Sequence, residues 1–188
     1  MRLRTTAILA TVAAAASIVL LAGCGGSASE ASPSTPTSTI AARQAAGQGP
    51  PGCLPNCANA NLTYADLQNT NLQNANFAGA NLMYAKLTGT DLAGADLTGA
   101  LLVRANLMRS NLIGTRLTGA DLMNADLISA NLTGADLTGA DLSRASLANA
   151  NLTRANLTRA KISWTDFTNA IWGSTTCRDG TVRDRCIL

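Results

Sequence analysis

Few side chains in this sequence could perform covalent or metal chemistry, because it contains five cysteines and no histidine. Without an imidazole, a Ser-His-Asp triad and a His-ligated metal site are both excluded. Candidate carboxylate pairs, such as Asp91 with Asp96 or Asp121 with Asp141, all fall at one position of a five-residue repeat. Nothing in their local sequence would separate their pKa values, so we expect them to be solvated and to hydrogen-bond the backbone. We therefore predict no catalytic residue, no bound metal and no cofactor.

The first cysteine, Cys24, follows an apolar segment with a basic start. Arg2 and Arg4 precede an apolar run from Ala7 to Leu21, which is the layout of a secretory signal. This run is too short to cross a bilayer as a helix. The tetrapeptide Leu-Ala-Gly-Cys that ends at Cys24 resembles the lipobox of bacterial lipoproteins. That resemblance implies that Cys24 carries lipid and becomes the first mature residue. An ordinary cleaved signal with an incidental cysteine is the alternative.

The segment after Cys24 has the composition of a linker. Residues 25–52 are mostly Ser, Ala, Thr, Pro, Gly and Gln, with one acid, Glu30, one base, Arg43, and no apolar period. Such a segment cannot bury enough apolar surface to offset the entropy of ordering it. We predict a signal peptide over residues 1–23 and a lipid-anchored flexible linker over residues 24–52. The expected location is extracytoplasmic, with the protein attached to the cell membrane through its lipid anchor.

Four further cysteines form two pairs that are close in sequence, Cys53 with Cys57 and Cys177 with Cys186. An even number of cysteines in an oxidising compartment indicates two disulfides. Three pairings are conceivable, and the local ones are favoured because the two pairs lie at opposite ends of the repeats. A zinc site is the weaker alternative, since pairs so far apart cannot form one four-thiolate cage.

A period of five residues runs through residues 60–172. Every fifth residue from Leu62 to Leu157 is Leu, except Phe77, and a small residue stands two positions before each of them. The series continues as Ile162, Phe167 and Trp172. Five residues advance about 500° on an α-helix, and on a strand they alternate between faces. The chain must therefore turn once per repeat to keep every leucine inside.

If each turn is about a right angle, four repeats close one coil. The 22 consecutive units from Leu62 to Phe167 then make about five and a half coils, a rod about 26 Å long at about 4.8 Å per coil. Units such as Ala-Asp-Leu-Thr-Gly at residues 95–99 and 135–139 resemble the pentapeptide repeat family. The resemblance covers residues 60–172 and implies an all-β fold, a right-handed quadrilateral β-helix. In that fold the small residue and the central leucine face inward and the other three face outward. Departures from Asp or Asn at the position before the centre are Lys86, Leu101, Arg116, Ser146, Lys161 and Ile171.

The two ends of such a rod are expected to be capped, because a β-helix exposes unpaired backbone edges there. We predict an N-terminal disulfide cap over residues 53–59 and a C-terminal one over residues 173–188. A turn is expected in the second cap at Asp179 and Gly180.

Residues twenty positions apart should stack, so each outer face can be examined as columns. One face places Met, Val, Tyr, Trp and Arg in adjacent columns, and these residue types are enriched at protein interfaces. An aligned apolar row often marks a partner site, although scattered outward apolar residues are normal. The candidate partner-binding residues are Tyr64, Met83, Tyr84, Val103, Arg104, Met123, Arg144 and Trp164.

Another face carries an outward row of threonines beside a glycine column. The threonines are Thr98, Thr118, Thr138 and Thr158. A flat hydroxylated β surface requires no function, since Thr suits strands. Binding of ice or of a repetitive polymer is the alternative.

Together these patterns predict a non-enzymatic exported lipoprotein that presents a rigid surface for protein–protein interaction in the cell envelope. The expected partner is another envelope protein or a second copy of the chain, with no nucleic acid and no small-molecule substrate. A purely structural envelope element is one alternative. Another is a gyrase-binding DNA mimic, as some pentapeptide repeat proteins are, but residues 60–172 hold eight Asp and eight Lys or Arg and are formally neutral.

Overall fold

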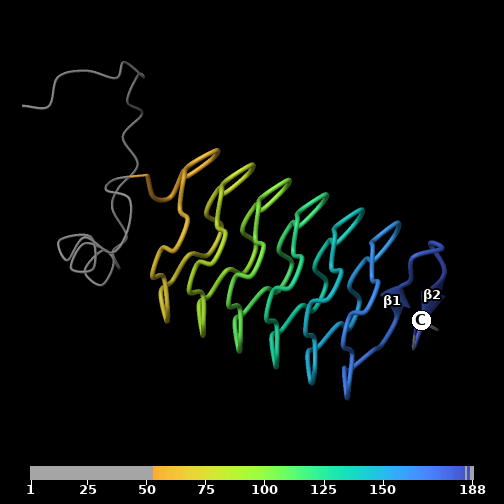
Figure 1. Ribbon diagram of the computed structural model, residues 1–188. Coiled ribbons are helices and arrows are strands. Elements are labelled where there is room, and N and C mark those ends of the chain that lie inside the picture. Colours follow the sequence, from red (N-terminus) through yellow and green to blue (C-terminus); the bar gives the residue numbers. More distant parts are fainter. Residues whose placement is uncertain (1–52, 185, 187–188) are drawn as a thin grey trace, which may run out of the picture. The chain divides into compact units, whose positions relative to one another are not determined.

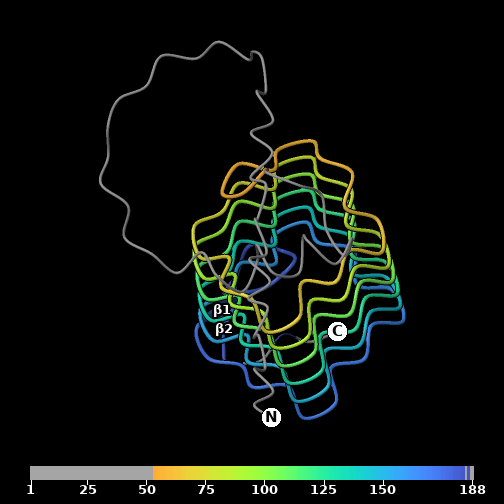
Figure 2. The same cartoon turned by 90° about the vertical axis from the view of Figure 1, so that its left-hand side faces the viewer.

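The computed structural model describes residues 53–184 and 186 of the 188-residue chain. In this part the backbone winds through successive coils stacked along one axis (Figure 1). Viewed along that axis, the coils superimpose on a common, roughly four-sided outline (Figure 2). The predicted signal peptide, the linker and Cys24 lie outside the described residues.

Parallel backbone pairing between coils defines the repeat. Bridges join residues twenty positions apart, from the first, Asn56 with Asn76, to the last, Asn156 with Thr176. Since each unit has five residues, four units complete one coil. From Cys57 to Leu157, the amide of each central residue donates to the coil that follows, as Leu97 N does to Arg116 O at 2.7 Å. This pairing satisfies the backbone polar groups along the sides of the rod.

A tight turn in every unit bends the chain at a corner. The carbonyl of the central residue accepts a hydrogen bond from the amide three residues later, as Leu117 O does from Ala120 N at 3.0 Å. The third residue of the turn has a positive φ in each described unit, from Asn59 at 58° to Ser174 at 50°. This is the geometry of a type II turn, which favours Gly or Asn at that position. The corners of the rod are therefore the positions two residues after each centre.

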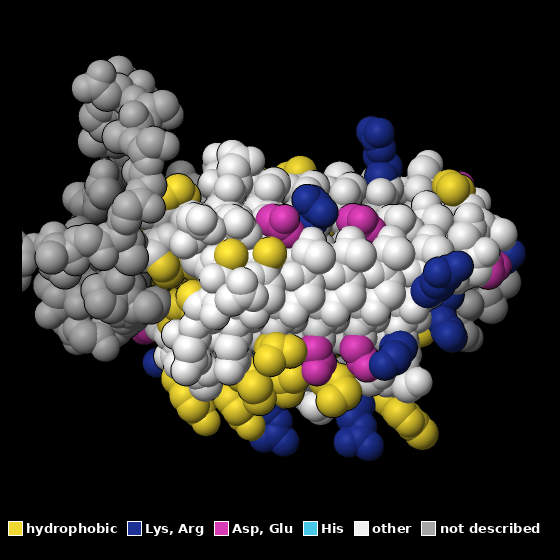
Figure 3. Space-filling model, turned by 90° about the horizontal axis from the view of Figure 1, so that it is seen from above, with side chains coloured by type: hydrophobic (Ala, Val, Ile, Leu, Met, Phe, Trp, Pro, Cys, Tyr) yellow, Lys and Arg dark blue, Asp and Glu magenta, His cyan; other side chains and the backbone are white. Residues whose placement is uncertain are grey.

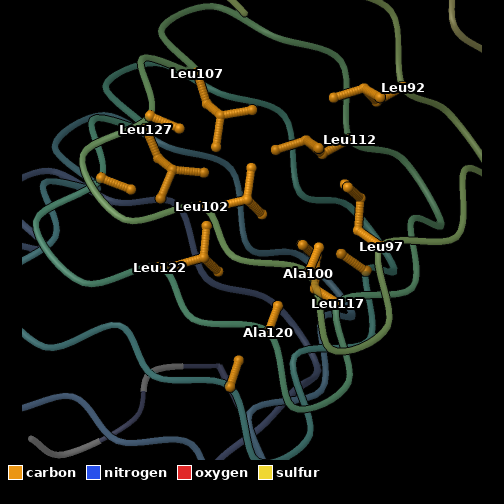
Figure 4. Close-up of a cluster of buried hydrophobic side chains, with 14 of the residues drawn as sticks. Leu92, Leu97, Ala100, Leu102, Leu107, Leu112, Leu117, Ala120, Leu122 and Leu127 are labelled. Atoms are coloured by element: carbon orange, nitrogen blue, oxygen red, sulfur yellow. The ribbon is translucent and has the colours of Figure 1, made fainter. Parts of the chain in front are cut away.

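The interior is filled by the central leucines and the small residues. Leu97, Leu117 and Leu137 succeed one another on one side of the rod and are 0% exposed. Figure 4 shows Leu97, Leu102, Leu107 and Leu112 directed into the interior from different sides. Each buried leucine contributes about 1.5–3 kcal/mol before the entropy of ordering the chain is subtracted. The predicted inward orientation of these two positions is confirmed.

Hydroxyl residues at the small position are accommodated by hydrogen bonds to the backbone. Thr115 donates to Leu92 O at 2.8 Å, and Thr175 donates to Leu152 O at 2.8 Å. A buried hydroxyl without a partner would be costly. Thr and Ser can therefore replace Ala in the core without interrupting the stack.

The cysteines at both ends belong to the five-residue frame. Cys57 and Cys177 lie five residues outside Leu62 and Trp172, at the position that central leucines occupy, and both are buried. The structure joins Cys57 to Cys53 and Cys177 to Cys186. The repeat geometry thus extends one unit beyond each end of residues 60–172.

A short antiparallel hairpin closes part of the C-terminal end. It consists of β1 (Thr175–Thr176) and β2 (Val182–Arg183), with Thr175 opposite Arg183 (Figure 1). Gly180, with φ of 80°, lies in the connection, and its amide donates to Cys177 O at 2.9 Å. The turn predicted at Asp179 and Gly180 is therefore present.

The last coil is less well covered than the others. Ile162, Phe167 and Trp172 pack against the core but remain partly exposed. The rings of Phe167 and Trp172 contact each other, with centroids 5.1 Å apart. The sequence places all three in the core, and their partial exposure follows because no further coil stacks on them within the described residues.

The positive φ at the corners predicts that Arg154→Gly stabilises the rod by about 0.5–1.5 kcal/mol, because glycine alone adopts this conformation without steric cost. Arg154 has a φ of 59° and lies next to Gly134 in the preceding coil. Urea unfolding followed by circular dichroism measures the effect. Arg154→Ala is the matched control, since it removes the side chain but keeps the strain and should stay close to wild type. Equal stability of the two variants would contradict the prediction.

Candidate binding face

The predicted partner-binding residues fall on one corner of the rod and on the side next to it. Two neighbouring columns, each stacked at twenty-residue intervals, form this surface. We call the first the aromatic corner: Tyr64, Tyr84, Arg104, Asn124, Arg144 and Trp164. We call the second the apolar column: Met83, Val103 and Met123. Together they are the binding face.

Contacts within the aromatic corner order its first half. The rings of Tyr64 and Tyr84 are stacked, with centroids 4.9 Å apart and planes 14° from parallel. The guanidinium of Arg104 lies 5.8 Å from the centroid of the Tyr84 ring and donates to its hydroxyl at 3.4 Å. Since Tyr64 and Arg104 cover its ring faces, Tyr84 presents mainly its edge and hydroxyl to solvent.

The two ends of the corner carry the most exposed aromatic side chains. Trp164 is 87% exposed and Tyr64 is 66% exposed. Between them, Met123 is 37% exposed, whereas Met83 and Val103 are half-buried. In the space-filling view, hydrophobic side chains gather along one edge of the rod, and Lys and Arg side chains project beyond them (Figure 3).

The residue types at the positive-φ positions distinguish this corner from the other three. All four corner columns have positive φ, and among the described residues only the aromatic corner contains no glycine. Its members include Tyr84 at 58° and Trp164 at 61°. A bulky residue in this conformation costs roughly 1–2 kcal/mol. The aromatic corner therefore keeps bulky side chains at positions where glycine would relieve the strain.

The aspartates of the repeat are committed to the coil itself. Each accepts a hydrogen bond from the amide two residues later, as Asp121 does from Met123 N at 3.0 Å and Asp141 from Ser143 N at 3.0 Å. These are Asx turns that support the corner. The aspartates therefore hydrogen-bond the backbone, as the sequence predicts.

Neighbouring hydroxyls keep one of these carboxyls ionised. Partial burial raises the pKa of Asp136, but hydrogen bonds from the Thr138 hydroxyl and amide and from the Thr118 hydroxyl outweigh it. Its pKa therefore lies below the ordinary value. A lowered pKa suits a structural carboxylate and does not suit a general acid at neutral pH.

Basic residues that replace the repeat Asp or Asn form ion pairs with the coil before them. Lys86 lies 3.9 Å from Asp66, Arg116 lies 3.3 Å from Asp96, and Lys161 lies 3.2 Å from Asp141. Three of the six departures thus pair charges in adjacent coils. Such exposed pairs contribute little stability.

Hydroxyls of the threonine row hydrogen-bond side chains of the adjacent coil. Thr118 donates to Asp136 at 3.0 Å, and Thr138 accepts from the Asn156 amide at 2.9 Å. Hydroxyls engaged in this way are not arranged as a free array for ice or a polymer. The structural interpretation of this face is therefore favoured.

Other kinds of site have no support in the part of the chain that is described. Within residues 53–184 and 186, no group of three or more Cys, Asp or Glu side chains could hold a metal ion. Over the same residues, no helix has the length and apolar character required to cross a membrane. An open cavity of about 210 Å³ lies at the C-terminal end, lined by Leu157, Ile162 and cap residues that include Arg178 and Arg183.

These features define a quadrilateral β-helix that displays side chains on rigid columns. The family model for pentapeptide repeats matches residues 60–99, 105–144 and 135–171, in eight copies. The chain therefore belongs to the pentapeptide repeat family, whose fold is the right-handed quadrilateral β-helix and whose members are generally structural or binding proteins rather than enzymes.

Solved structures of the same family resemble this chain. One is a pentapeptide repeat protein from the cyanobacterium Cyanothece 51142, with 28% identity, coverage of 60% of this chain and 87% of that chain, and a TM-score of 0.45. A second comes from the thylakoid lumen of Arabidopsis thaliana, with 38% identity, coverage of 51% and 70%, and a TM-score of 0.39. A third is QnrB1, a plasmid-mediated fluoroquinolone resistance protein, with 17% identity, coverage of 61% and 66%, and a TM-score of 0.42. No protein of curated function is similar enough to be matched.

Proposed function

We propose that this chain is a non-enzymatic exported lipoprotein, attached to the cell membrane through lipid on Cys24. Its right-handed rod of about five and a half coils presents the binding face to a protein of the cell envelope, either another protein or a second copy. The observation that carries the proposal is the aromatic corner. It contains no glycine, and five of its six positive-φ positions carry Tyr, Arg or Trp.

The composition of the face fits a protein partner. Tyr, Trp, Met and Arg are the residues that anchor protein interfaces. Single exposed apolar residues would need no explanation, but here they repeat through successive coils on two adjacent columns. The backbone of the columns is already ordered by pairing between coils, so it loses little freedom on binding, which favours affinity.

Two other functions are less well supported. A purely structural element has no use for exposed aromatic residues on a strained backbone. A DNA mimic that binds gyrase requires a strongly acidic surface in the cytoplasm. The array is formally neutral, and its aspartates are held against the coil by hydrogen bonds to backbone amides.

A crosslinked pull-down from envelope membranes tests the proposal by comparing wild type with the double variant Met83→Lys and Met123→Lys. Both side chains point outward, so the fold should persist, whereas two buried charges should abolish binding. We expect a crosslinked protein that is lost in the variant. The matched control is Ala93→Lys with Thr153→Lys, at the same repeat position on another side of the rod, which should keep that protein. Identical profiles of crosslinked proteins for the wild type and both double variants would contradict the proposal.

A further inference from the structure

We infer that the binding face pairs with the same face of a second copy of this chain, with the two rods antiparallel. This inference rests on the proposed function, because it names the occupant of that face. It comes from the order of side chains along the aromatic corner. The residues taken from Tyr64 to Trp164 are chemically complementary to the same residues taken in the opposite direction.

Two-fold symmetry determines which residues would meet. In a symmetric pair, if residue i of one copy contacts residue j of the other, then j also contacts i. The corner has six members, one per coil, so an axis between Arg104 and Asn124 pairs the first member with the last and the second with the fifth. The corner then meets the corner, and the apolar column meets the apolar column.

Each resulting pair is chemically matched. Tyr64 meets Trp164 of the second copy, which joins the two most exposed aromatic side chains of the corner. Tyr84 presents its ring edge and hydroxyl to the Arg144 guanidinium, since its ring faces are already covered by Tyr64 and Arg104. At the axis, Arg104 donates to the side-chain oxygen of Asn124, and this contact occurs twice.

The apolar column follows the same symmetry. Val103 meets Met123 on both sides of the axis, so the apolar contacts lie at the centre of the pair. Further out, Met83 meets Ser143, and Thr63 meets Ser163 at the edge. An apolar centre with a polar rim is the usual arrangement of a protein interface.

Like-charge repulsion selects this register over its neighbours. A shift by one coil in one direction places Arg104 against Arg144 of the other copy. A shift in the opposite direction places Arg104 against Arg104. In the proposed register no two corner arginines oppose each other, and juxtaposed like charges disfavour the alternatives.

A lipid surface fits the face less well than a second copy does. Met83 and Val103 are half-buried between their neighbours, so they do not project far enough to insert into a bilayer.

Cysteine crosslinking tests the antiparallel arrangement in the full chain carrying Cys24→Ser, which prevents lipidation. Thr63→Cys is made in one preparation and Ser163→Cys in another. We expect a disulfide-linked dimer only when the two are mixed, because Thr63 meets Ser163 across the pair. Within a pair of identical variants the new cysteines lie about five coils apart, roughly 24 Å, which is beyond disulfide reach. Crosslinking of either preparation alone, or of neither the mixture nor the single preparations, would overturn the inference.

Substitutions at the axis test the register through the dissociation constant, measured by sedimentation velocity. Asn124→Asp places a carboxylate opposite Arg104 twice per dimer and should lower the dissociation constant about 3- to 30-fold. Asn124→Arg places a second cation opposite Arg104 and should raise the dissociation constant by a similar factor. Asn149→Arg is the control, because Asn149 lies on another corner with a similar φ, 59° against 55°. An effect of Asn149→Arg equal to that of Asn124→Arg would contradict the assignment.

Failure of this inference can be told apart from failure of the proposed function. A chain that stays monomeric at all concentrations, yet crosslinks in membranes to a different protein through Met83 and Met123, overturns the dimer and leaves the proposed function intact. A monomeric chain that sediments with phosphatidylglycerol vesicles, and loses this in the Met83→Lys and Met123→Lys variant, overturns both in favour of a lipid surface.

Discussion

Replacement of Leu122 by Asp is expected to lower the free energy of unfolding by at least about 4 kcal/mol and to unfold the coil around it. Leu122 is 0% exposed and lies near the middle of the array. A carboxylate there has no polar partner, and the leucine contacts are lost as well. Because each coil contacts only its neighbours, the remaining coils should then unfold in separate transitions. Urea denaturation followed by circular dichroism measures both effects.

The adjacent residue provides the control for this substitution. Met123 follows Leu122 in the chain but is 37% exposed, so Met123→Asp should change stability by no more than about 0.5 kcal/mol. Leu122→Ala should fall between the two, with a loss of about 2–5 kcal/mol. If the two Asp variants were equally stable, the assignment of inward and outward positions would be wrong.

Loss of the C-terminal disulfide is expected to have the second-largest effect. The double variant Cys177→Ser and Cys186→Ser should lose about 2–3 kcal/mol, since the bond closes a loop of about ten residues. The loss should be concentrated in the last coil, because Cys177 occupies a central core position and Ile162 and Phe167 are already partly exposed. Hydrogen exchange should show faster amide exchange in that coil than in the coils near Leu97.

Reduction of the wild-type protein gives an independent test of both disulfides. A reducing agent opens the Cys53–Cys57 bond as well, so the melting temperature should fall further than in the C-terminal double variant. A melting temperature unchanged by reduction would show that the disulfides do not stabilise the ends.

The two ends of the array illustrate how far sequence analysis could go. The spacing of the cysteines favours local pairs, and the structure joins the same pairs. Cys57 and Cys177 also continue the period of five residues. This continuation is easily missed, because the residue type changes from an apolar residue to cysteine. Extending the frame by one unit in each direction would have placed both cysteines in the core.

The candidate face was only partly predictable. Its residues could be found by taking every twentieth position, because stacked coils bring them together. The contacts of Tyr84 with Tyr64 and Arg104 depend on side-chain rotamers and on the distance between coils. The absence of glycine from this corner acquires meaning only once the positive φ values are known.

The sequence by itself determined which positions face inward, because a period of five can keep leucine buried only if the chain turns once per unit. Tertiary structure decided where the corners lie. A type II turn is defined by a hydrogen bond and a positive φ, and glycine is favoured at the positive-φ position. Because Tyr, Arg and Trp occupy several of these positions, the residue pattern does not specify them. Tertiary structure also decided that the aspartates support the coil, as their amide and hydroxyl partners are positioned by the turns and by the coils on either side. These features depend on pairing between residues twenty positions apart, which is a property of the folded chain rather than of any single repeat.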